Sequence, residues 1–244
     1  MIPYEGEATN ADIELFGSNV GSEMYIEVHT RPDIAYAVSV LSRFLSNPSP
    51  QHLKAADRIL QYLKGTKYLG IVYGGGITDR RITQLHGYCD AGYASDKSQR
   101  KLVSGNAFFF VGGIVSHSSK RQTTVTLSTT KAEYYALAKA VAESLWLQMI
   151  LRELMYKGPE IKKLLLYGDN QSSLNLVENP EFHQRTKHID VKHHFIRGQV
   201  EKGSIELNYT PTDEMVADGL TKPLTAANNK KLVKLLRMES IQIT

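Results

Sequence analysis

Four acidic residues stand where a folded chain could assemble a hydrolytic site. They lie near the end of an expected strand, in the first turns of a long expected helix, between a strand and a helix, and in a short helix near the C-terminus: Asp90, Glu133, Asp169 and Asp218. Carboxylates gathered at one edge of an α/β sheet repel one another unless cations lie between them. Such hard oxygen ligands suit Mg²⁺ or Mn²⁺, and two ions ~3.5–4 Å apart can hold the attacking and leaving oxygens of a phosphodiester.

Each acid also has a purely structural explanation. Asp90 precedes Ala-Gly and could belong to a turn, while Glu133 is favourable near any helix N-terminus. Asp169 could serve simply as the N-cap of the next helix, and Asp218 could lie on a solvated helix face. The four positions taken together favour the metal site over these separate explanations.

The N-terminal part reads as mostly helical. Apolar spacing predicts a helix over residues 34–46, and Ser49 with Pro50 marks the start of a second helix that stops at Gly65. Residues 5–21 are acidic and read as loop. A short strand is expected over 69–73, before the glycines at 74–76, and we place a domain boundary at about residue 78.

After that boundary the pattern changes to strands and then alternating strands and helices. Two strands surround the tight turn Gly112-Gly113, and the expected elements are strands 82–91, 104–111, 114–118, 164–167 and 205–209 and helices 129–156, 171–177, 190–202, 215–220 and 228–238. We expect the apolar run 108–110 and Trp146 to pack in the core. This order predicts an α/β fold whose sheet is part antiparallel and part parallel.

Composition and charge exclude several protein classes. The chain has 244 residues and one cysteine, Cys89, so a disulfide scaffold or a multi-cysteine zinc site is excluded. No apolar run approaches the ~20 residues of a membrane span, and the N-terminus has no signal-peptide pattern. Residues 1–80 hold 7 basic and 9 acidic side chains (net −2) and residues 81–244 hold 22 and 16 (net +6). This asymmetry favours a polyanionic partner for the C-terminal two-thirds.

Several long blocks carry a family resemblance. The blocks are GYCDAGYASD (87–96), SGNAFFFVGGIVSHSSKRQTTVTLSTTKAEYYALAKAVAESLWL (104–147) and YGDNQSSLNLVENPEFHQRTKHIDVKHHFIRGQVEKGSIELNYTPTDEMVADGLTKPL (167–224). They resemble the ribonuclease H domain of copia-type (Ty1/copia) long-terminal-repeat retrotransposon Pol polyproteins. The block HTRPDIAYAVSVLSRFLSNPSPQHLKAADRILQYLKGT (29–66) resembles the C-terminal end of the reverse transcriptase of the same elements.

The resemblance implies a fold, a domain division and a site. It implies a ribonuclease H-like α/β fold, with three antiparallel strands followed by parallel strands and flanked by helices, over residues 78–240. A small thumb- or connection-like helical segment, residues 1–77, precedes it. Asp90, Glu133 and Asp169 match the first three catalytic and metal-binding carboxylates of the family. Asp218, in VADGLTK, matches the fourth, with Asp213 as its rival.

The expected chemistry is divalent-metal-dependent hydrolysis of the RNA strand of RNA–DNA hybrids, with two Mg²⁺ ions for which Mn²⁺ can substitute. The chain departs from the family pattern at several points. Gly92-Tyr93 stands where Trp is common, and residues 209–217 lack the histidine of cellular relatives. Glu23 and Glu27 occupy positions where apolar residues are expected. The chain has no adjacent Asp-Asp pair, so we expect no polymerase activity from it alone.

Basic and polar residues near these acids form the expected nucleic-acid contacts, through phosphates or the 2′-hydroxyl of RNA: Lys120, Arg121, Gln171, Arg185, Lys187 and His188. A solvated basic surface explains the histidine-rich segment 182–195 equally well, and its spacing fits no standard zinc finger.

Two other functions compete with the ribonuclease. The chain could be an inactive remnant of a degenerate element that still binds nucleic acid. An integrase-like enzyme is disfavoured because Glu133 precedes Asp169. The expected partners are an RNA–DNA hybrid and the upstream polymerase region, with no membrane. The expected location is a retrotransposon particle in the cytoplasm, with the nucleus as the alternative.

Overall fold

The computed structural model describes residues 1–74, 84–92, 102–122, 129–154, 163–178 and 187–241. Their helices and strands, in chain order, are α1 (Asn10–Thr30), η1 (Pro32–Ile34), α2 (Ala35–Leu41), η2 (Ser42–Phe44), α3 (Pro50–Gly65), β1 (Leu69–Ile71), β2 (His86–Gly92), β3 (Val103–Phe110), β4 (Gly113–Arg121), α5 (Thr129–Glu153), β5 (Leu164–Gly168), α6 (Gln171–Glu178), α7 (Lys187–Glu201), β6 (Ile205–Tyr209), η4 (Val216–Leu220), α8 (Ala226–Leu235) and β7 (Met238–Ser240).

The central sheet has the expected mixed topology. Its strand order is β4-β3-β2-β5-β6. The hairpin β3–β4 and the pair β2–β3 are antiparallel, whereas β5 runs parallel to both β2 and β6. Three consecutive antiparallel strands followed by parallel ones confirm the fold class predicted from the sequence.

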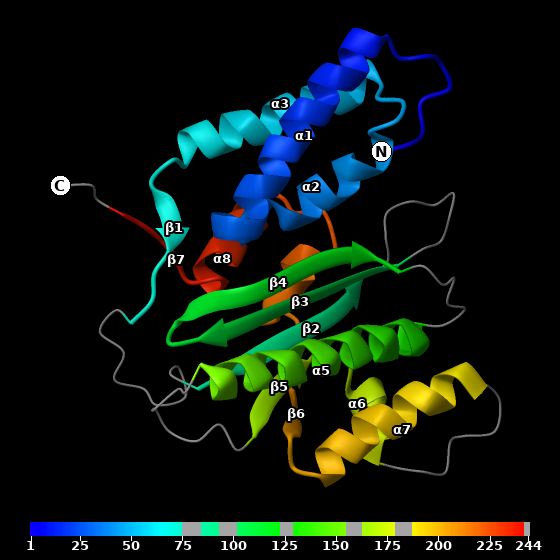
Figure 1. Cartoon of the computed structure of the whole chain (residues 1–244), viewed down its shortest axis with the longest axis vertical. Helices are drawn as coiled ribbons and strands as arrows, with labels where there is room; N and C mark the ends of the chain where they lie inside the picture. The colour runs from blue at the N-terminus through cyan, green and yellow to red at the C-terminus, as the bar shows by residue number, and fades with distance from the viewer. Residues whose placement is uncertain (75–83, 93–101, 123–128, 155–162, 179–186, 242–244) are drawn as a thin grey trace.

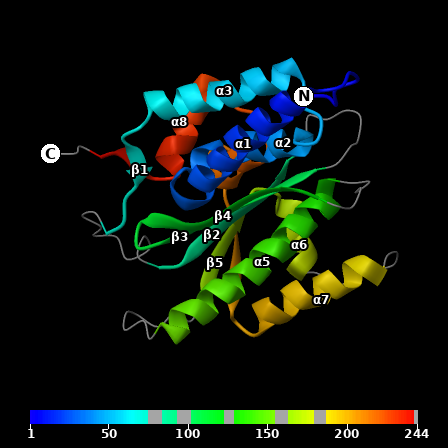
Figure 2. The same cartoon turned by 45° about the horizontal axis from the view of Figure 1, so that its top comes forward.

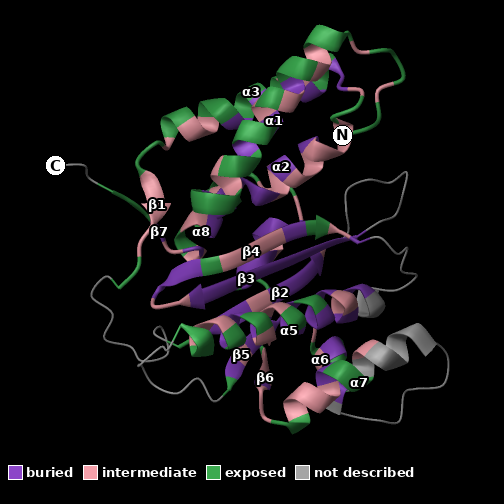
Figure 3. Ribbon diagram, viewed as in Figure 1, coloured by how far each residue is buried: buried purple, intermediate pink, exposed green. Residues whose placement is uncertain are grey.

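Helices cover both faces of this sheet (Figures 1 and 2). Because neighbouring strand residues point to opposite faces, Phe108 packs with α5 and α7 while Phe109 packs with α2, η4 and α8. Both phenylalanines are almost completely buried, as expected for this run, and β2 and β3 are the most buried strands in Figure 3. Strand β2, which carries Asp90, therefore lies between two packed cores.

Helix α3 follows its local signals closely. It begins at Pro50 and ends at Gly65, as predicted. The Ser49 hydroxyl accepts a hydrogen bond from the His52 backbone N–H, and the His52 ring accepts one from the Ser49 N–H. This reciprocal cap satisfies two backbone donors that the first turn of a helix leaves without partners.

The expectation of a loop over residues 5–21 is wrong, because Asn10–Thr30 form the long helix α1. The Thr9 hydroxyl caps it by accepting from the Asp12 N–H. Only Phe16, Val20 and Glu23 are buried along it, so the apolar stripe is too sparse to show in the sequence. Packing of that narrow stripe onto α2 and α3, rather than a strong amphipathic pattern, stabilises α1.

Two C-terminal expectations also need correction. Trp146 is 50% exposed on α5 and does not pack in the core. The last helix stops at Leu235, and Met238–Ser240 instead form β7, which pairs antiparallel with β1. Such a pairing joins segments far apart in the sequence, so no local pattern predicts it.

The N-terminal helices contact the sheet and α8 directly. Glu27 of α1 pairs with His117 of β4 (Oε1–Nε2 2.8 Å), and the Asn229 side chain of α8 donates to the Tyr62 hydroxyl of α3 at 3.1 Å. The division into segments 1–77 and 78–240 remains a prediction, since its boundary falls in residues 75–83, outside the described part. None of the described helices is long and apolar enough to span a bilayer.

Glu23 occupies a core position with a charged side chain. It is completely buried, and neither carboxylate oxygen has a hydrogen-bond partner among the described residues. Burial, reinforced by the nearby Asp57, raises the pKa of Glu23 from 4.5 to about 7. Its folded-state pKa lies above the unfolded value. Protonation of Glu23 therefore favours the folded state. This contribution to the free energy of unfolding is complete below pH 4.5 and is lost as the pH rises through about 7.

We therefore expect Glu23→Gln to stabilise the protein at pH 8 by roughly 3 kcal/mol, about 5–10 °C in melting temperature. At pH 4.5 the gain should be small. Thermal denaturation at both pH values measures it, with the exposed Glu14→Gln on the same helix as control. A stabilisation that does not depend on pH would contradict the assignment of a buried, proton-binding carboxyl.

Candidate active site

Asp90 lies in the middle of the sheet, on β2. It is 5% exposed, and its Oδ2 accepts a hydrogen bond from the hydroxyl of the buried Thr221. Its neighbour Cys89 faces the opposite side of β2 and donates through its Sγ to the Tyr167 carbonyl at 3.6 Å. The aspartate is therefore held in a buried, hydrogen-bonded position, and a surface turn does not explain it.

Glu133 reaches β2 from the N-terminal part of α5. Its Oε2 accepts a hydrogen bond from the backbone N–H of Ala91 at 3.1 Å. That residue follows Asp90 directly, so the hydrogen bond ties the glutamate to the strand that carries the aspartate. Helix packing over the sheet, through Ala132 and Ala136 against Ala91, fixes this approach.

Asp169 follows β5, the strand parallel to β2. Its Oδ2 accepts a hydrogen bond from the Thr212 hydroxyl at 3.0 Å. The cap of helix α6 is supplied by Asn170, whose Oδ1 accepts from the Ser173 N–H at 3.1 Å. A capping role therefore does not account for Asp169, and its carboxylate is available to the site.

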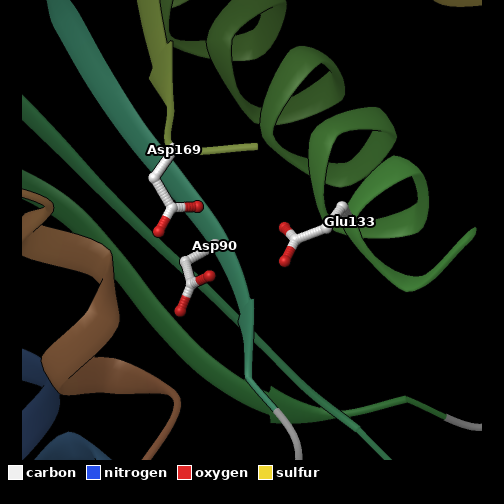
Figure 4. A group of neighbouring side chains, drawn as sticks. All are labelled: Asp90, Glu133 and Asp169. Atoms are coloured by element: carbon white, nitrogen blue, oxygen red, sulfur yellow. The ribbon is translucent and has the colours of Figure 1, made fainter. Parts of the chain in front are cut away.

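The three carboxylates converge from three separate elements (Figure 4). One oxygen from each of Asp90, Glu133 and Asp169 lies within 4.8 Å of the others. Within the described part of the chain this group contains hard oxygen donors only, with no histidine or thiolate among them. That donor set fits a divalent metal ion such as Mg²⁺ or Mn²⁺.

The pKa values of two of these carboxyl groups are raised in the folded chain. Burial, with the charges of Asp169 and Asp218, raises the pKa of Asp90 from 3.8 to about 6, although the Thr221 hydrogen bond opposes the rise. Burial, with the charges of Asp90 and Asp169, raises the pKa of Glu133 from 4.5 to about 8. Burial and, after it, the neighbouring negative charges thus disfavour the ionised forms, and a bound dication would oppose this effect.

Asp218 lies near this group but outside it. It stands on η4, which packs against β2 and β3, and its Oδ1 pairs with Lys222 Nζ at 2.5 Å. Its charge is close enough to contribute to the raised pKa of Asp90. The rival Asp213 is 75% exposed and lies 3.9 Å from Lys231 Nζ. The fourth carboxylate remains a prediction, for which Asp218 has the better-anchored position.

The expected nucleic-acid contacts are only partly described. Gln171 lines an open cleft of about 440 Å³ together with Glu133, Asp169 and Tyr209. Lys120 and Arg121 lie two strands from Asp90 at the same end of the sheet. Arg185 lies outside the described residues, and the side chains of Lys187 and His188 on α7 are not described either. Of the three residues whose side chains are described, Gln171, Lys120 and Arg121, the structure thus places Gln171 in the cleft.

Sequence reasoning missed the residues that hold the carboxylates. They are Thr221 on Asp90, Thr212 on Asp169 and the backbone N–H of Ala91 on Glu133. The only signal in the sequence was the position of Thr221, three residues after Asp218 within a block already singled out. Threonine hydroxyls form hydrogen bonds with many kinds of group, so the partner of a given threonine is known only from the folded structure.

Comparison with known proteins places the chain. No family model matches it. The Pol polyprotein of transposon TNT 1-94 from Nicotiana tabacum is 43% identical over 92% of this chain and 16% of its own length. The Pol polyprotein of transposon RE1 from Arabidopsis thaliana is 40% identical over 84% of this chain and 14% of its own. A foamy viral protease–reverse transcriptase, solved in complex with an RNA/DNA hybrid, shares the fold with a TM-score of 0.51. That match has 13% identity and covers 82% of this chain and 25% of the other.

The sheet topology, the helices on both faces and the Asp-Glu-Asp group define a ribonuclease H-like domain. Over most of its length the chain is similar to the Pol polyproteins of copia-type retrotransposons, and it matches their ribonuclease H region. It spans about a sixth of the length of these two polyproteins.

Proposed function

We propose that this chain is a ribonuclease H that cleaves the RNA strand of RNA–DNA hybrids with the help of divalent metal ions. The observation that carries the proposal is the convergence of Asp90, Glu133 and Asp169 from β2, α5 and the end of β5. Such an arrangement is unfavourable for a folded protein without cations, since the pKa values of two of the acids are raised. A metal-binding role explains why the fold maintains it.

The carboxylates and the residues beside them would have separate roles in the reaction. Two bound Mg²⁺ ions, which Mn²⁺ could replace, would supply an activated water and charge stabilisation at the leaving oxygen. Asp90, Glu133 and Asp169 hold the negative charge that binds the ions, and Asp218 is the proposed fourth carboxylate. Gln171 lies in the cleft beside Asp169, and Lys120 and Arg121 are proposed to contact phosphates along the same end of the sheet.

The test is cleavage of an end-labelled RNA–DNA hybrid by the purified chain with Mg²⁺, with Mn²⁺ and with chelator. We expect cutting of the RNA strand alone, only with metal, and none of RNA–RNA or DNA–DNA duplexes. Asp169→Asn should abolish cutting while leaving hybrid binding in a gel-shift assay within about threefold, because phosphate contacts dominate affinity.

The controls separate this proposal from its rival. Glu178→Gln, at the end of the helix that follows Asp169, should cut like the wild type. Full activity of Asp169→Asn would refute the site. Hybrid binding without cutting by the wild-type chain would instead support an inactive remnant that retains the fold. We further propose the upstream polymerase region as a partner, and a cytoplasmic particle or the nucleus as the location.

A further inference from the structure

We propose that Thr221 is the positioning residue that fixes the Asp90 carboxylate for metal binding. The proposal rests on the function proposed above. Thr221 directly follows η4 and is completely buried. In Figure 4 the ribbon of this region lies on the side of Asp90 away from Glu133. Thr221 thus contacts Asp90 from the side opposite Glu133.

Two glycines let Thr221 come this close to the sheet. A Cβ on Gly92 of β2 would lie 2.6 Å from Thr221 Oγ1, and a Cβ on Gly105 of β3 would lie 2.8 Å from Thr221 Cγ2. Both distances are shorter than carbon and oxygen atoms tolerate, so any larger residue would push η4 outward. Gly105 is also the register partner of Asp90. The two strands therefore form a socket for this threonine next to the aspartate.

The hydroxyl in that socket has two oxygens within reach. It donates to Asp90 Oδ2, and it lies 3.0 Å from the Asp218 carbonyl oxygen. The Thr221 backbone N–H also donates to that carbonyl, at 3.2 Å. The Thr221 methyl group faces Gly105, so the rotamer has little freedom. The hydrogen bond to Oδ2 restrains the orientation of the Asp90 carboxylate.

This arrangement links two acids from distant parts of the chain. Thr221 contacts both: it donates to the Asp90 side chain and lies within hydrogen-bond distance of the Asp218 backbone carbonyl. Groups that orient a metal ligand typically account for 10–100-fold in metal affinity or activity. A buried threonine with a purely structural role would instead affect stability alone, which makes the two roles separable by experiment.

The experiment measures Mn²⁺ binding to the purified chain by isothermal titration calorimetry, beside melting temperature and hybrid cleavage. Thr221→Val keeps the shape and removes the hydroxyl, and Thr221→Ser keeps the hydroxyl and removes the methyl group. Ser144→Ala removes a fully buried hydroxyl from α5, where its partner is the Val141 carbonyl, and serves as control.

We expect Thr221→Val to weaken Mn²⁺ binding by about 10–100-fold and to raise the Mg²⁺ concentration needed for half-maximal cleavage. Thr221→Ser should bind Mn²⁺ within about threefold of the wild type, and Ser144→Ala should bind it equally well. Wild-type affinity in Thr221→Val, or an equal loss in the valine and serine variants, would overturn the inference. If the valine variant fails to fold, Thr221→Ala replaces it, because alanine also removes the hydroxyl. Weaker Mn²⁺ binding by the alanine variant than by the serine variant supports the inference, and equal binding by the two overturns it.

The outcomes also distinguish this inference from the proposed function. A wild-type chain that binds Mn²⁺ but does not cut hybrids contradicts the ribonuclease, while the effect of Thr221→Val on binding still decides the role of Thr221. A chain that cuts hybrids with unchanged metal affinity in all variants contradicts only the positioning role. A wild-type chain that binds no Mn²⁺ counts against both.

Discussion

Replacing Glu133 by glutamine is expected to abolish metal-dependent cleavage and at the same time to stabilise the metal-free protein. Glutamine can still accept the hydrogen bond from the Ala91 N–H, so the local structure should persist. What it lacks is the negative charge that the three-carboxylate group offers to a cation. We expect at least a 100-fold loss of hybrid cleavage, beyond the ~10–100-fold typical of groups that only orient a ligand.

The gain in stability follows from the raised pKa of the same group. Burial, then the charges of Asp90 and Asp169, raise the pKa of Glu133 to about 8 in the folded chain. Its contribution to stability is complete below the unfolded pKa of 4.5 and is lost as the pH rises through about 8. Without metal, Glu133→Gln should therefore stabilise the protein at pH 8 by on the order of 2–4 kcal/mol, and hardly at pH 4.5.

Thermal denaturation in chelator at both pH values, with cleavage assays in parallel, checks both effects. Glu153→Gln, an exposed glutamate on the same helix, should change neither property. Loss of activity with lower stability at pH 8 would mean that Glu133 supports the fold and that its ionised carboxylate does not destabilise the folded chain. Retained activity would remove Glu133 from the site.

Asp33→Ala should destabilise the whole chain by about 3–5 kcal/mol, because it leaves a buried arginine without its counter-charge. Asp33 accepts from Arg31 Nε at 2.9 Å and from Nη2 at 2.7 Å, and the Tyr62 hydroxyl donates to it at 2.6 Å. Arg31 is 4% exposed. The expected fall in melting temperature is about 10 °C.

The same variant tests whether the N-terminal helices and the sheet unfold together. Asn229 of α8 donates to the Tyr62 hydroxyl, and β1 pairs with β7, so the loss should spread to both parts. Fluorescence of Trp146 on α5 and far-ultraviolet circular dichroism should then give coincident, equally shifted transitions. Two separate transitions would instead favour independent units divided near residue 78. The double variant Arg31→Met/Asp33→Ala, which removes both charges, should recover most of the stability.

Local signals in the sequence predicted a large part of the fold. Ser49, Pro50 and Gly65 predicted both ends of α3, because capping depends on residues within one turn of the helix end. The glycine turn at 112–113 predicted the hairpin β3–β4. Helix α1 was missed because its few buried positions, Phe16, Val20 and Glu23, become a core stripe only when α2 and α3 pack against them.

Periodicity, caps and motif blocks are local properties, and they were enough to predict most strands and helices, apart from α1 and β7, and the acids at their ends. That Asp90, Glu133 and Asp169 meet, and that Asp218 stays outside their group, follows from the tertiary structure alone. It also decided that Thr221 lies against Asp90 between two glycines. These relations join residues from distant segments of the chain. Their distances follow from strand register and helix packing, which no single segment encodes.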